Sequence, residues 1–308
     1  MLSDTWFQFS LPDFQYAFLS ILLEGAPFLL AGALLSGILE EFLPPSLMTR
    51  LLPPNPRLAI VASAFVGLMI PVCECGIVPV VRRLLRKGLP VSCGITYMLA
   101  APIVNPLVIL STLAAFRGQG ALEMTIFRFA LGITVAVSAG LVCTRFAPFS
   151  ILRRGVLAPA AEDHHHEIEA DIYGRLANVA ATATRDFLDV SVFFVLGAAA
   201  AALFGTAVNQ EIILPLTTNL PLSVASLMGL ASVLSVCSTT DAFIAATLTA
   251  FPMAAKLAFL VFGPMLDFKL LFLYGAAFSK RFILLLALGL FLMIGLICWR
   301  IGSLNLSW

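Results

Sequence analysis

The sequence predicts an all-α polytopic membrane protein made of two related halves with broken or re-entrant helices. The first reason is composition: 60% of the 308 residues are hydrophobic and 11% are charged, whereas about 25% of the residues in a soluble domain are charged. The second reason is a series of apolar runs, because about 20 apolar helical residues cross a bilayer core of about 30 Å. The third reason is that unusual residues recur at a nearly constant offset in the two halves.

The apolar runs fall into two sets of four, separated by a long polar segment. The predicted organisation is a membrane half over 1–145, a polar cytoplasmic linker over 146–184 and a second membrane half over 185–308. The N-terminal stretch MLSDTWFQFSLPD lacks the basic region and the small-residue cleavage site of a signal peptide, so the first run is expected to remain as a span. The runs cover residues 14–43, 57–85, 89–116, 121–145, 186–208, 222–251, 254–278 and 282–300.

Several classes of function and partner are disfavoured by what the sequence lacks. A net charge of +1 without a basic block argues against a nucleic-acid partner. No GxxxxGK[ST] motif is present, so ATP hydrolysis within this chain is not expected. The six cysteines lie in or beside apolar runs, which is not the pattern of a secreted disulfide framework. We therefore predict a chain surrounded by lipid that is not an enzyme and has no cofactor or resident metal.

The internal repeat rests on residue types that are rare in apolar helices. Weak internal symmetry is typical of secondary transporters, whose substrate sites lie at discontinuous helices near the bilayer midplane. The matching pairs are Cys73 with Cys237 at an offset of 164, Pro90 with Pro252, Pro102 with Pro264 and Asn105 with Asp267 at 162, and Glu24 with Asp189 at 165.

The second run of each half contains a motif that should interrupt the helix, PVCECG at 71–76 and SVCSTTD at 235–241. Each run is either one broken crossing or a hairpin that enters and leaves on the same side. Hairpins make the halves inverted and, with the N-terminus outside, place 13 Lys and Arg residues inside and 4 outside, whereas single crossings with the N-terminus inside give 11 against 6. Because positive residues gather on the cytoplasmic side, hairpins are favoured, with both termini outside and the linker inside. The four outside cations are then Arg117, Arg128, Lys256 and Arg300.

Polar and ionisable side chains inside the apolar runs mark the candidate functional site. A charge in a bilayer normally faces a partner or a water-filled cavity, and non-helical backbone is tolerated there only where it is buried in protein or lines a cavity. We therefore expect the two motifs to meet at one site; the alternative is that these residues only satisfy one another between packed helices. The predicted substrate-binding residues are Cys73, Glu74, Cys75, Asn105, Cys237, Ser238, Thr239, Asp241 and Asp267, and the candidates for coupling transport to protons are Glu24, Asp189 and Lys269.

Asn105 and Asp267 each follow a proline inside an apolar run, in TYMLAAPIVNPLVIL and LVFGPMLDFKLLFL. A proline within a helix frees a backbone carbonyl, and the polar residue follows about one turn later on nearly the same face. Such a pair either lines the pathway or satisfies the kink. For Asn105 both interpretations remain open. Asp267 is the stronger candidate because a charge is harder to bury, although Lys269 can neutralise part of it.

The CEC spacing indicates affinity for soft ions. Two thiolates select monovalent copper, zinc or trivalent arsenic, although a CxC pair is a short motif and the sequence has no CxxC. Cys93, Cys143 and Cys298 are expected to be buried core residues, as free cysteines usually are. The run from His164 through His165 to His166, which lies between acidic residues, is interpreted as a solvated loop, with metal binding as the alternative.

Three stretches resemble one family and together extend the resemblance over essentially the whole chain. They are PVCECGIVPVVRRLLRKGLPVSCGITYMLAAPIVNPLVI, ASVLSVCSTTDAFIA and FGPMLDFKLL. They resemble the YraQ-type family of predicted permeases, which includes the efflux permeases for trivalent organoarsenicals such as methylarsenite. The resemblance implies a multi-pass permease of the cell inner membrane and leaves the substrate open. By position in the matching blocks it carries over Cys73, Glu74, Cys75, Pro102, Asn105, Cys237, Asp241, Pro264 and Asp267.

The predicted function is secondary transport that exports a soft-ligand substrate, such as a trivalent organoarsenical or another metalloid, through a site at the two broken helices. The alternative is a transmembrane thiol–disulfide electron carrier, in which Cys73 or Cys75 exchanges a disulfide with Cys237. The missing CxxC and the resemblance argue against the carrier. A membrane scaffold or assembly factor would explain the hydrophobicity but not the embedded charges.

Overall fold

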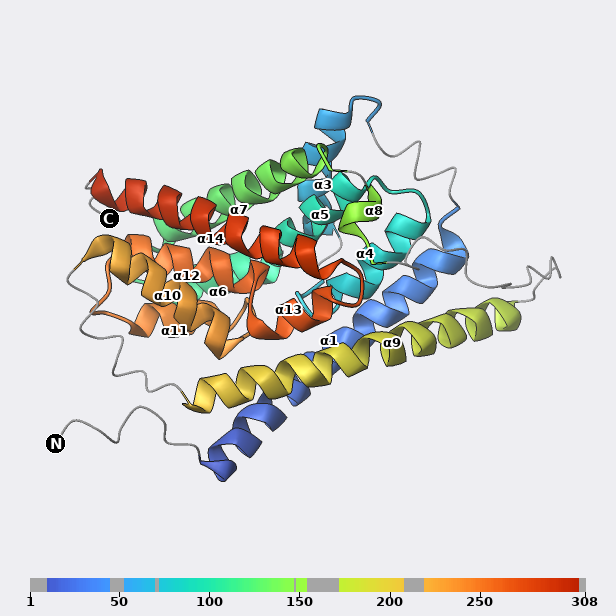
Figure 1. Ribbon diagram of the computed structural model, residues 1–308, viewed down its shortest axis with the longest axis horizontal. Coiled ribbons are helices and arrows are strands. Elements are labelled where there is room, and N and C mark those ends of the chain that lie inside the picture. The colour runs from blue at the N-terminus through green and yellow to red at the C-terminus, as the bar shows by residue number, and fades with distance from the viewer. Residues whose placement is uncertain are drawn as a thin grey trace.

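Helices form nearly all the regular structure of this chain (Figure 1). The computed structural model describes residues 10–44, 53–69, 72–146, 148–153, 172–207 and 219–304, so the predicted histidine loop lies outside the described residues. Within these ranges no sheet forms, and an isolated bridge joins Leu152 to Phe278. The helices are α1 (Leu11–Phe42), α3 (Pro56–Met69), α4 (Ile77–Arg86), α5 (Val91–Ala100), α6 (Pro106–Ala115), α7 (Ala121–Cys143), α8 (Pro148–Ile151), α9 (Ile172–Ala207), α10 (Leu220–Leu234), α11 (Asp241–Thr247), α12 (Met253–Met265), α13 (Phe268–Tyr274) and α14 (Lys280–Ser303).

Five stretches of the described helices are long and apolar enough to cross a membrane. Large hydrophobic side chains remain exposed along them, such as Leu23 at 75%, which is stable where the solvent is lipid. The chain is a multi-pass membrane protein, as its composition predicts. Helix α9 begins at Ile172, inside the segment 146–184 that was expected to be a linker. The candidate spans are Leu11–Phe42, Ala121–Cys143, Tyr173–Thr206, Met253–Tyr274 and Lys280–Ser303.

The bundle has two ends, which lie to the right and to the left in Figure 1. At the right-hand end, termed the α4 end, α1 and α4 both finish. There the Lys87 ammonium, just after α4, donates to the carbonyl oxygens of Glu40 and Leu43 at 2.6 and 2.7 Å. At the left-hand end, termed the α11 end, α1 begins and α14 finishes.

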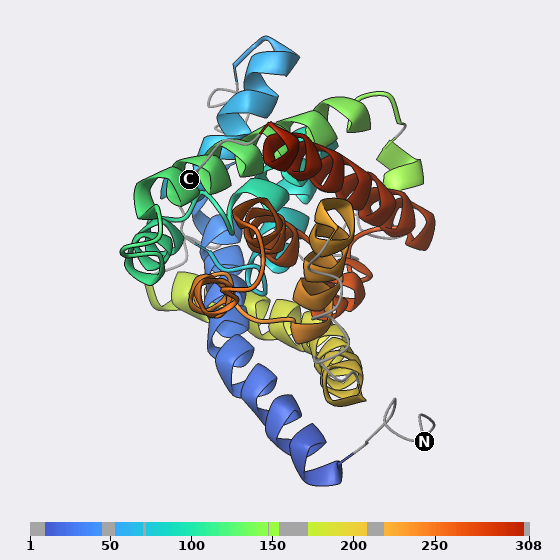
Figure 2. The same cartoon turned by 90° about the vertical axis from the view of Figure 1, so that its left-hand side faces the viewer.

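Helices α1 and α9 form a long antiparallel pair on one side of the bundle (Figures 1 and 2). Gly25 of α1 lies against Phe194 of α9, whereas Gly37, further along α1, lies against Val179, which comes earlier in α9. The two helices therefore run in opposite directions. Glycines at these positions let membrane helices approach closely. The pair therefore joins the first helix of one half to the first helix of the other.

The segment from α3 to α4 enters and leaves the bundle at the α4 end. Ile60, near the start of α3, packs on Gly140 near the end of α7, and Gly140 also contacts the carbonyl of Ser92 at the start of α5. Deeper in the bundle, Gly67 of α3 packs against Ala101. Helix α4 then returns to the end of α1. The start of α3 and the end of α4 therefore lie at the same end of the bundle.

The segment from α10 to α11 is arranged in the same way at the opposite end. Leu220 at the start of α10 and Ala254 at the start of α12 both pack against Gly302 at the end of α14. Deeper in the bundle, Ala231 of α10 contacts Gly263 of α12. Helix α11 returns toward the start of α12, so this segment begins and ends at the α11 end of the bundle.

Two further crossings are broken near their middle. Helices α5 and α6 run along α7, with Ile103 at the break packed on Gly132. Helices α12 and α13 form the corresponding crossing in the second half. The new helix at each break starts with an N-cap, which satisfies an orphan amide: the Asn105 side chain accepts from the Leu107 amide at 3.0 Å, and Asp267 accepts from the Leu270 amide at 2.6 Å.

Gly76 permits close contact between the first hairpin and α1. A Cβ at this position would lie 2.6 Å from the carbonyl oxygen of Phe28 and 3.3 Å from the Cα of Gly32. We expect Gly76→Ala to destabilise the purified protein by about 1–3 kcal/mol, the usual cost of overpacking, and to lower its melting temperature. Gly229→Ala is the control, because no heavy atom lies within 4 Å of the added group. Equal melting temperatures for the two variants would contradict this packing.

Candidate functional site

The two hairpins turn with the same backbone hydrogen bonds. In the first, the amide of Ile77 donates to the carbonyl oxygen of Cys73 at 3.2 Å; in the second, the amide of Asp241 donates to that of Cys237 at 3.0 Å. Each turn leads directly into a short helix, α4 or α11. The cysteines paired by their sequence offset therefore occupy equivalent positions in the two turns.

The two turns meet beside α1 at one small cavity. Across the junction, the Ser238 hydroxyl of the second turn donates to Glu74 Oε2 of the first at 3.2 Å. The cavity has a volume of about 10 Å³, which leaves room for at most about one water molecule. In this form of the structure it is too small to hold a larger ligand. The lining residues are Ile21, Glu24, Gly25, Phe28, Cys73, Glu74, Cys75, Ser235, Cys237 and Lys269.

Three thiols line this cavity, and they come from both halves of the chain. Cys73 and Cys75 flank Glu74 in the first turn, and both are buried. The Cys237 sulfur of the second turn accepts a bond from the Thr239 hydroxyl at 3.7 Å. Gly25 of α1 faces Cys75, and because glycine has no side chain the thiol lies close to the helix backbone. The arrangement concentrates soft sulfur ligands at the junction of the two breaks.

A buried charge cluster adjoins the thiols. Lys269 Nζ lies 3.5 Å from Glu74 Oε1 and 3.7 Å from Asp267 Oδ2, and it donates to the carbonyl oxygen of Ser235 at 3.2 Å. The side chains of Lys269 and Glu74 are 4% and 1% exposed. Buried charges persist only when they are paired, and here one ammonium serves two carboxylates. The cluster thus carries one excess negative charge when all three groups are ionised.

Glu24 forms the exposed edge of the cavity. It lies on α1, and its carboxylate accepts a hydrogen bond from the Thr240 hydroxyl of the second turn at 3.2 Å. Of the candidates predicted to couple transport to protons, Glu24 and Lys269 therefore lie at the cavity. Asp189 does not: its side chain is 59% exposed and pairs with Arg82 at 3.3 Å.

Asp241 is held by an arginine that the sequence reasoning missed as a site residue. Arg128 of α7 donates to both carboxylate oxygens of Asp241 at 3.0 and 2.8 Å, and to the carbonyl oxygen of Ser238 at 3.1 Å. Its other terminal nitrogen donates to the Thr112 hydroxyl at 2.8 Å. Arg128 therefore ties the second turn to the first half of the chain, and Asp241 does not line the cavity.

Two of the four cations that the hairpin topology places outside are buried within the protein. Arg128 is 2% exposed and Lys256 is 3% exposed, and the Lys256 ammonium lies 5.9 Å from the centre of the Phe116 ring. The position of Arg128 inside the apolar run 121–145 was the available signal, because an ionisable residue there needs a partner.

Asn105 and Asp267 are helix caps, and neither lines the cavity. Asn105 makes a structural bond to the Leu107 amide, whereas Asp267 adds its contact with Lys269 to its capping bond. Among the described residues, no three His, Cys, Asp or Glu side chains are grouped so that they could hold a metal ion. The cavity in this closed form therefore brings thiols together without a preformed metal site.

Residues 10–300 match the ArsP_1 family, whose members are described as predicted permeases. The chain belongs to this permease family. Over 270 residues the permease is 37% identical to the UPF0718 protein YcgR of Bacillus subtilis (strain 168), covering 87% of this chain and 90% of that protein. Over 268 residues it is 35% identical to a "Putative two-component membrane permease complex subunit" of Streptococcus mutans serotype c (strain ATCC 700610 / UA159), covering 87% of each. No solved structure matches the chain.

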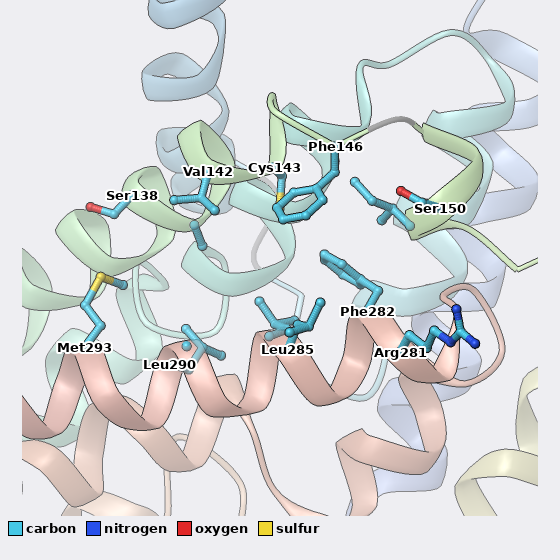
Figure 3. A pocket seen from close by; sticks show the side chains of 14 residues that line it. Ser138, Val142, Cys143, Phe146, Ser150, Arg281, Phe282, Leu285, Leu290 and Met293 are labelled. Carbon is cyan, nitrogen blue, oxygen red and sulfur yellow. The ribbon is translucent and has the colours of Figure 1, made fainter.

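A much larger cavity of the permease lies away from the charged junction. It occupies about 510 Å³ between α7 and α14 (Figure 3). Apolar side chains such as Val142, Phe282 and Leu285 line it, and Arg281 lies at one end. Val142 and Leu285 are exposed at 52% and 58%, so the cavity opens on the lateral surface that contacts lipid. It contains none of the predicted site residues, and the junction of the two turns remains the candidate site.

Proposed function

We propose that this permease is a secondary transporter of the cell inner membrane that exports a soft-ligand substrate, such as a trivalent organoarsenical, through the cavity at the two helix breaks. The observation that carries the proposal is the meeting of Cys73, Cys75 and Cys237 with Glu74 and Lys269 in one cavity. Secondary transporters place substrate sites at discontinuous helices near the bilayer midplane. Ionisable residues at that depth usually belong to a transport pathway.

Thiol chemistry supports trivalent arsenic as the substrate class. Thiolates are soft ligands and prefer soft metals and metalloids over hard cations. Cys73 and Cys75 can occupy two valences of an arsenic atom whose third valence carries a methyl group, and Cys237 supplies a third sulfur for an unmethylated species. Since the closed cavity has room for about one water molecule, binding requires the two turns to separate.

We also propose that the two halves are inverted repeats. The re-entrant hairpins enter from opposite ends of the bundle and turn with equivalent hydrogen bonds at Cys73 and Cys237. A glycine–alanine contact occurs at the equivalent place in each half, with the two residue types exchanged: Gly67 contacts Ala101 in the first half, and Ala231 contacts Gly263 in the second. Such symmetry supports alternating access, in which one half rocks against the other around a fixed site.

The charge distribution supports a cytoplasmic position for the α4 end. Arg82, Arg83, Arg86 and Lys87 lie in α4 or directly after it, and positive residues gather on the cytoplasmic side. Arg153, which follows α8, and Ser303, the last residue of α14, lie at opposite ends of the bundle (Figure 1). We expect a cysteine introduced at Ser303 to react with an impermeant maleimide in intact cells. A cysteine at Arg153 should react only after permeabilisation. Labelling of both positions from the same side would contradict the inverted arrangement.

Binding and transport of methylarsenite test the proposed substrate. A ligand that binds only the folded state raises its melting temperature, so we expect methylarsenite to stabilise the purified permease more than arsenite, copper, zinc, thiosulfate or a small thiol does. Uptake into proteoliposomes should depend on a pH gradient if Glu24 or Glu74 carries a coupling proton. Uptake that ignores the gradient would remove proton coupling, and the absence of any thermal shift would remove the soft-ligand substrate.

A thiol–disulfide electron carrier is the second candidate, because the cavity holds thiols from both halves. Disulfide exchange needs an attacking thiolate and a reachable sulfur, and Cys73 or Cys75 with Cys237 supplies both. Thiol trapping with mass spectrometry under oxidising and reducing conditions separates the candidates. A Cys73–Cys237 or Cys75–Cys237 disulfide that cycles between the two conditions would favour the carrier over the exporter.

A further inference from the structure

A second buried polar cluster lies between α1, α4 and α9, away from the thiol cavity. Arg83 Nη2 donates to Asp186 Oδ2 at 3.0 Å, and Arg83 Nη1 lies 3.3 Å from Glu40 Oε2. The Ser36 hydroxyl donates to the same oxygen of Asp186. Lys87 Nζ lies 3.5 Å from Glu40 Oε2. The side chains of Arg83 and Asp186 are each 9% exposed, so this pair is nearly closed to solvent, whereas Glu40 at 38% forms the exposed side of the network.

The network lies between the cavity and the α4 end. Phe28 is the last residue of α1 that lines the cavity, and Ser36 and Glu40 of the network follow two to three helical turns later. At 1.5 Å per residue the network starts about 12 Å beyond the cavity. Between them Gly32 packs directly on Gly76, with no space for a side chain. The route from the cavity to the α4 end is thus closed first by backbone contact and then by ion pairs.

The opposite mouth of the cavity is closed more weakly. Glu24 is exposed there, and the Thr240 hydroxyl bond at 3.2 Å joins it to the second turn. In the described part of the chain no ion pair spans this mouth. The two ends therefore differ in chemistry: a charged network seals one, and a single hydroxyl contact closes the other.

We propose that the Arg83–Asp186 ion pair, with Ser36 and Glu40, is the gate that closes the substrate cavity toward the α4 end. This inference rests on the proposed function in that the thiol cavity is taken as the substrate site. Asp186 and Glu40 belong to α9 and α1, which start different halves of the chain, and Arg83 bridges them through its two terminal nitrogens. Movement of α4 relative to these helices breaks both bonds, and water that enters on opening solvates the released charges.

A neighbouring ion pair provides a matched control. Arg82 and Asp189 lie on the same two helices as Arg83 and Asp186 and pair at 3.3 Å. Their side chains are 17% and 59% exposed, and exposed pairs of this kind contribute little. The two pairs have the same chemistry and differ in burial, so a gating role predicts different effects for identical substitutions.

Accessibility of the cavity thiols tests the gate. In a background with Cys93, Cys143 and Cys298 replaced by alanine, the remaining thiols are Cys73, Cys75 and Cys237. Their rate of reaction with an impermeant maleimide is measured in right-side-out and inside-out membrane vesicles. We expect Asp186→Asn and Arg83→Gln to raise the rate about tenfold from the α4 end alone, while Asp189→Asn and Arg82→Gln stay within twofold of the parent.

The proposal would be overturned if the Arg83 and Asp186 variants react with maleimide at the same rate as the Arg82 and Asp189 variants. It would also be overturned if the rate rises only from the α11 end. If Asp186→Asn and Arg83→Gln fail to reach the membrane, Ser36→Ala is measured instead, because it removes one hydrogen bond and keeps both charges. It is expected to raise the rate about threefold, and an unchanged rate would overturn the proposal. The readout is independent of transport, so failure of methylarsenite as a substrate and failure of the gate give different results.

Discussion

Replacing Cys73 and Cys75 together by serine is expected to abolish methylarsenite export while the protein remains folded in the membrane. Serine nearly preserves the size of the side chain but replaces the soft sulfur by a hard oxygen, which trivalent arsenic and other soft ions bind poorly. Both thiols line the closed cavity. Each single substitution is expected to abolish export as well, and Cys237→Ser is expected to impair it. The measurement is efflux or resistance in cells without their own arsenical exporters, with expression matched by immunoblot.

Cys143→Ser and Cys298→Ser are the controls for this experiment. Both thiols are buried but neither lines the cavity between the two turns, so export is expected to stay at the level of the unmodified protein. Export at that level by the double variant of Cys73 and Cys75 would contradict soft-ligand coordination at this site. The two turns would then act only as a gate for a different substrate.

The two helix breaks could be predicted from sequence because their signals are local. PVCECG and SVCSTTD each place polar residues where an apolar helix should continue, and such residues are costly in lipid unless they line a site. The constant offset between Cys73 and Cys237 indicated equivalent positions, and the structure gives them equivalent turns. The direction of each hairpin depends on weak charge asymmetry in the sequence, and the packing of Ile60 and Leu220 at opposite ends of the bundle supports the inverted arrangement proposed above.

Contacts that are distant in the sequence could not be predicted in the same way. Arg128 and Asp241 are 113 residues apart, so neither local pattern nor offset links them, and the sequence does not indicate Arg128 as a site residue. The offset also paired Glu24 with Asp189, yet only Glu24 reaches the cavity, because α9 places Asp189 beside Arg82. An internal repeat therefore predicts that two segments share a backbone conformation, but not that the paired side chains have the same role.

Arg128→Met is expected to destabilise the permease by about 3–5 kcal/mol, because it leaves the Asp241 carboxylate buried without its counter-ion. Asp241→Leu alone should have a similar effect by stranding the guanidinium. The double variant Arg128→Met/Asp241→Leu is expected to recover most of the loss, since a buried ion pair is often replaceable by apolar residues at little cost. The measurement is the free energy of unfolding in detergent, read as a double-mutant cycle.

Arg82→Met is the matched control for this cycle, because its partner Asp189 is 59% exposed and such a pair contributes about 0–1 kcal/mol. A double variant as unstable as Arg128→Met would show that Arg128 acts through its other bonds, to the Ser238 carbonyl and the Thr112 hydroxyl. The second turn would then be fixed to α7 by those bonds rather than by charge. If the double variant is stable but no longer exports, the ion pair positions the Cys237 turn for substrate and is not needed for folding.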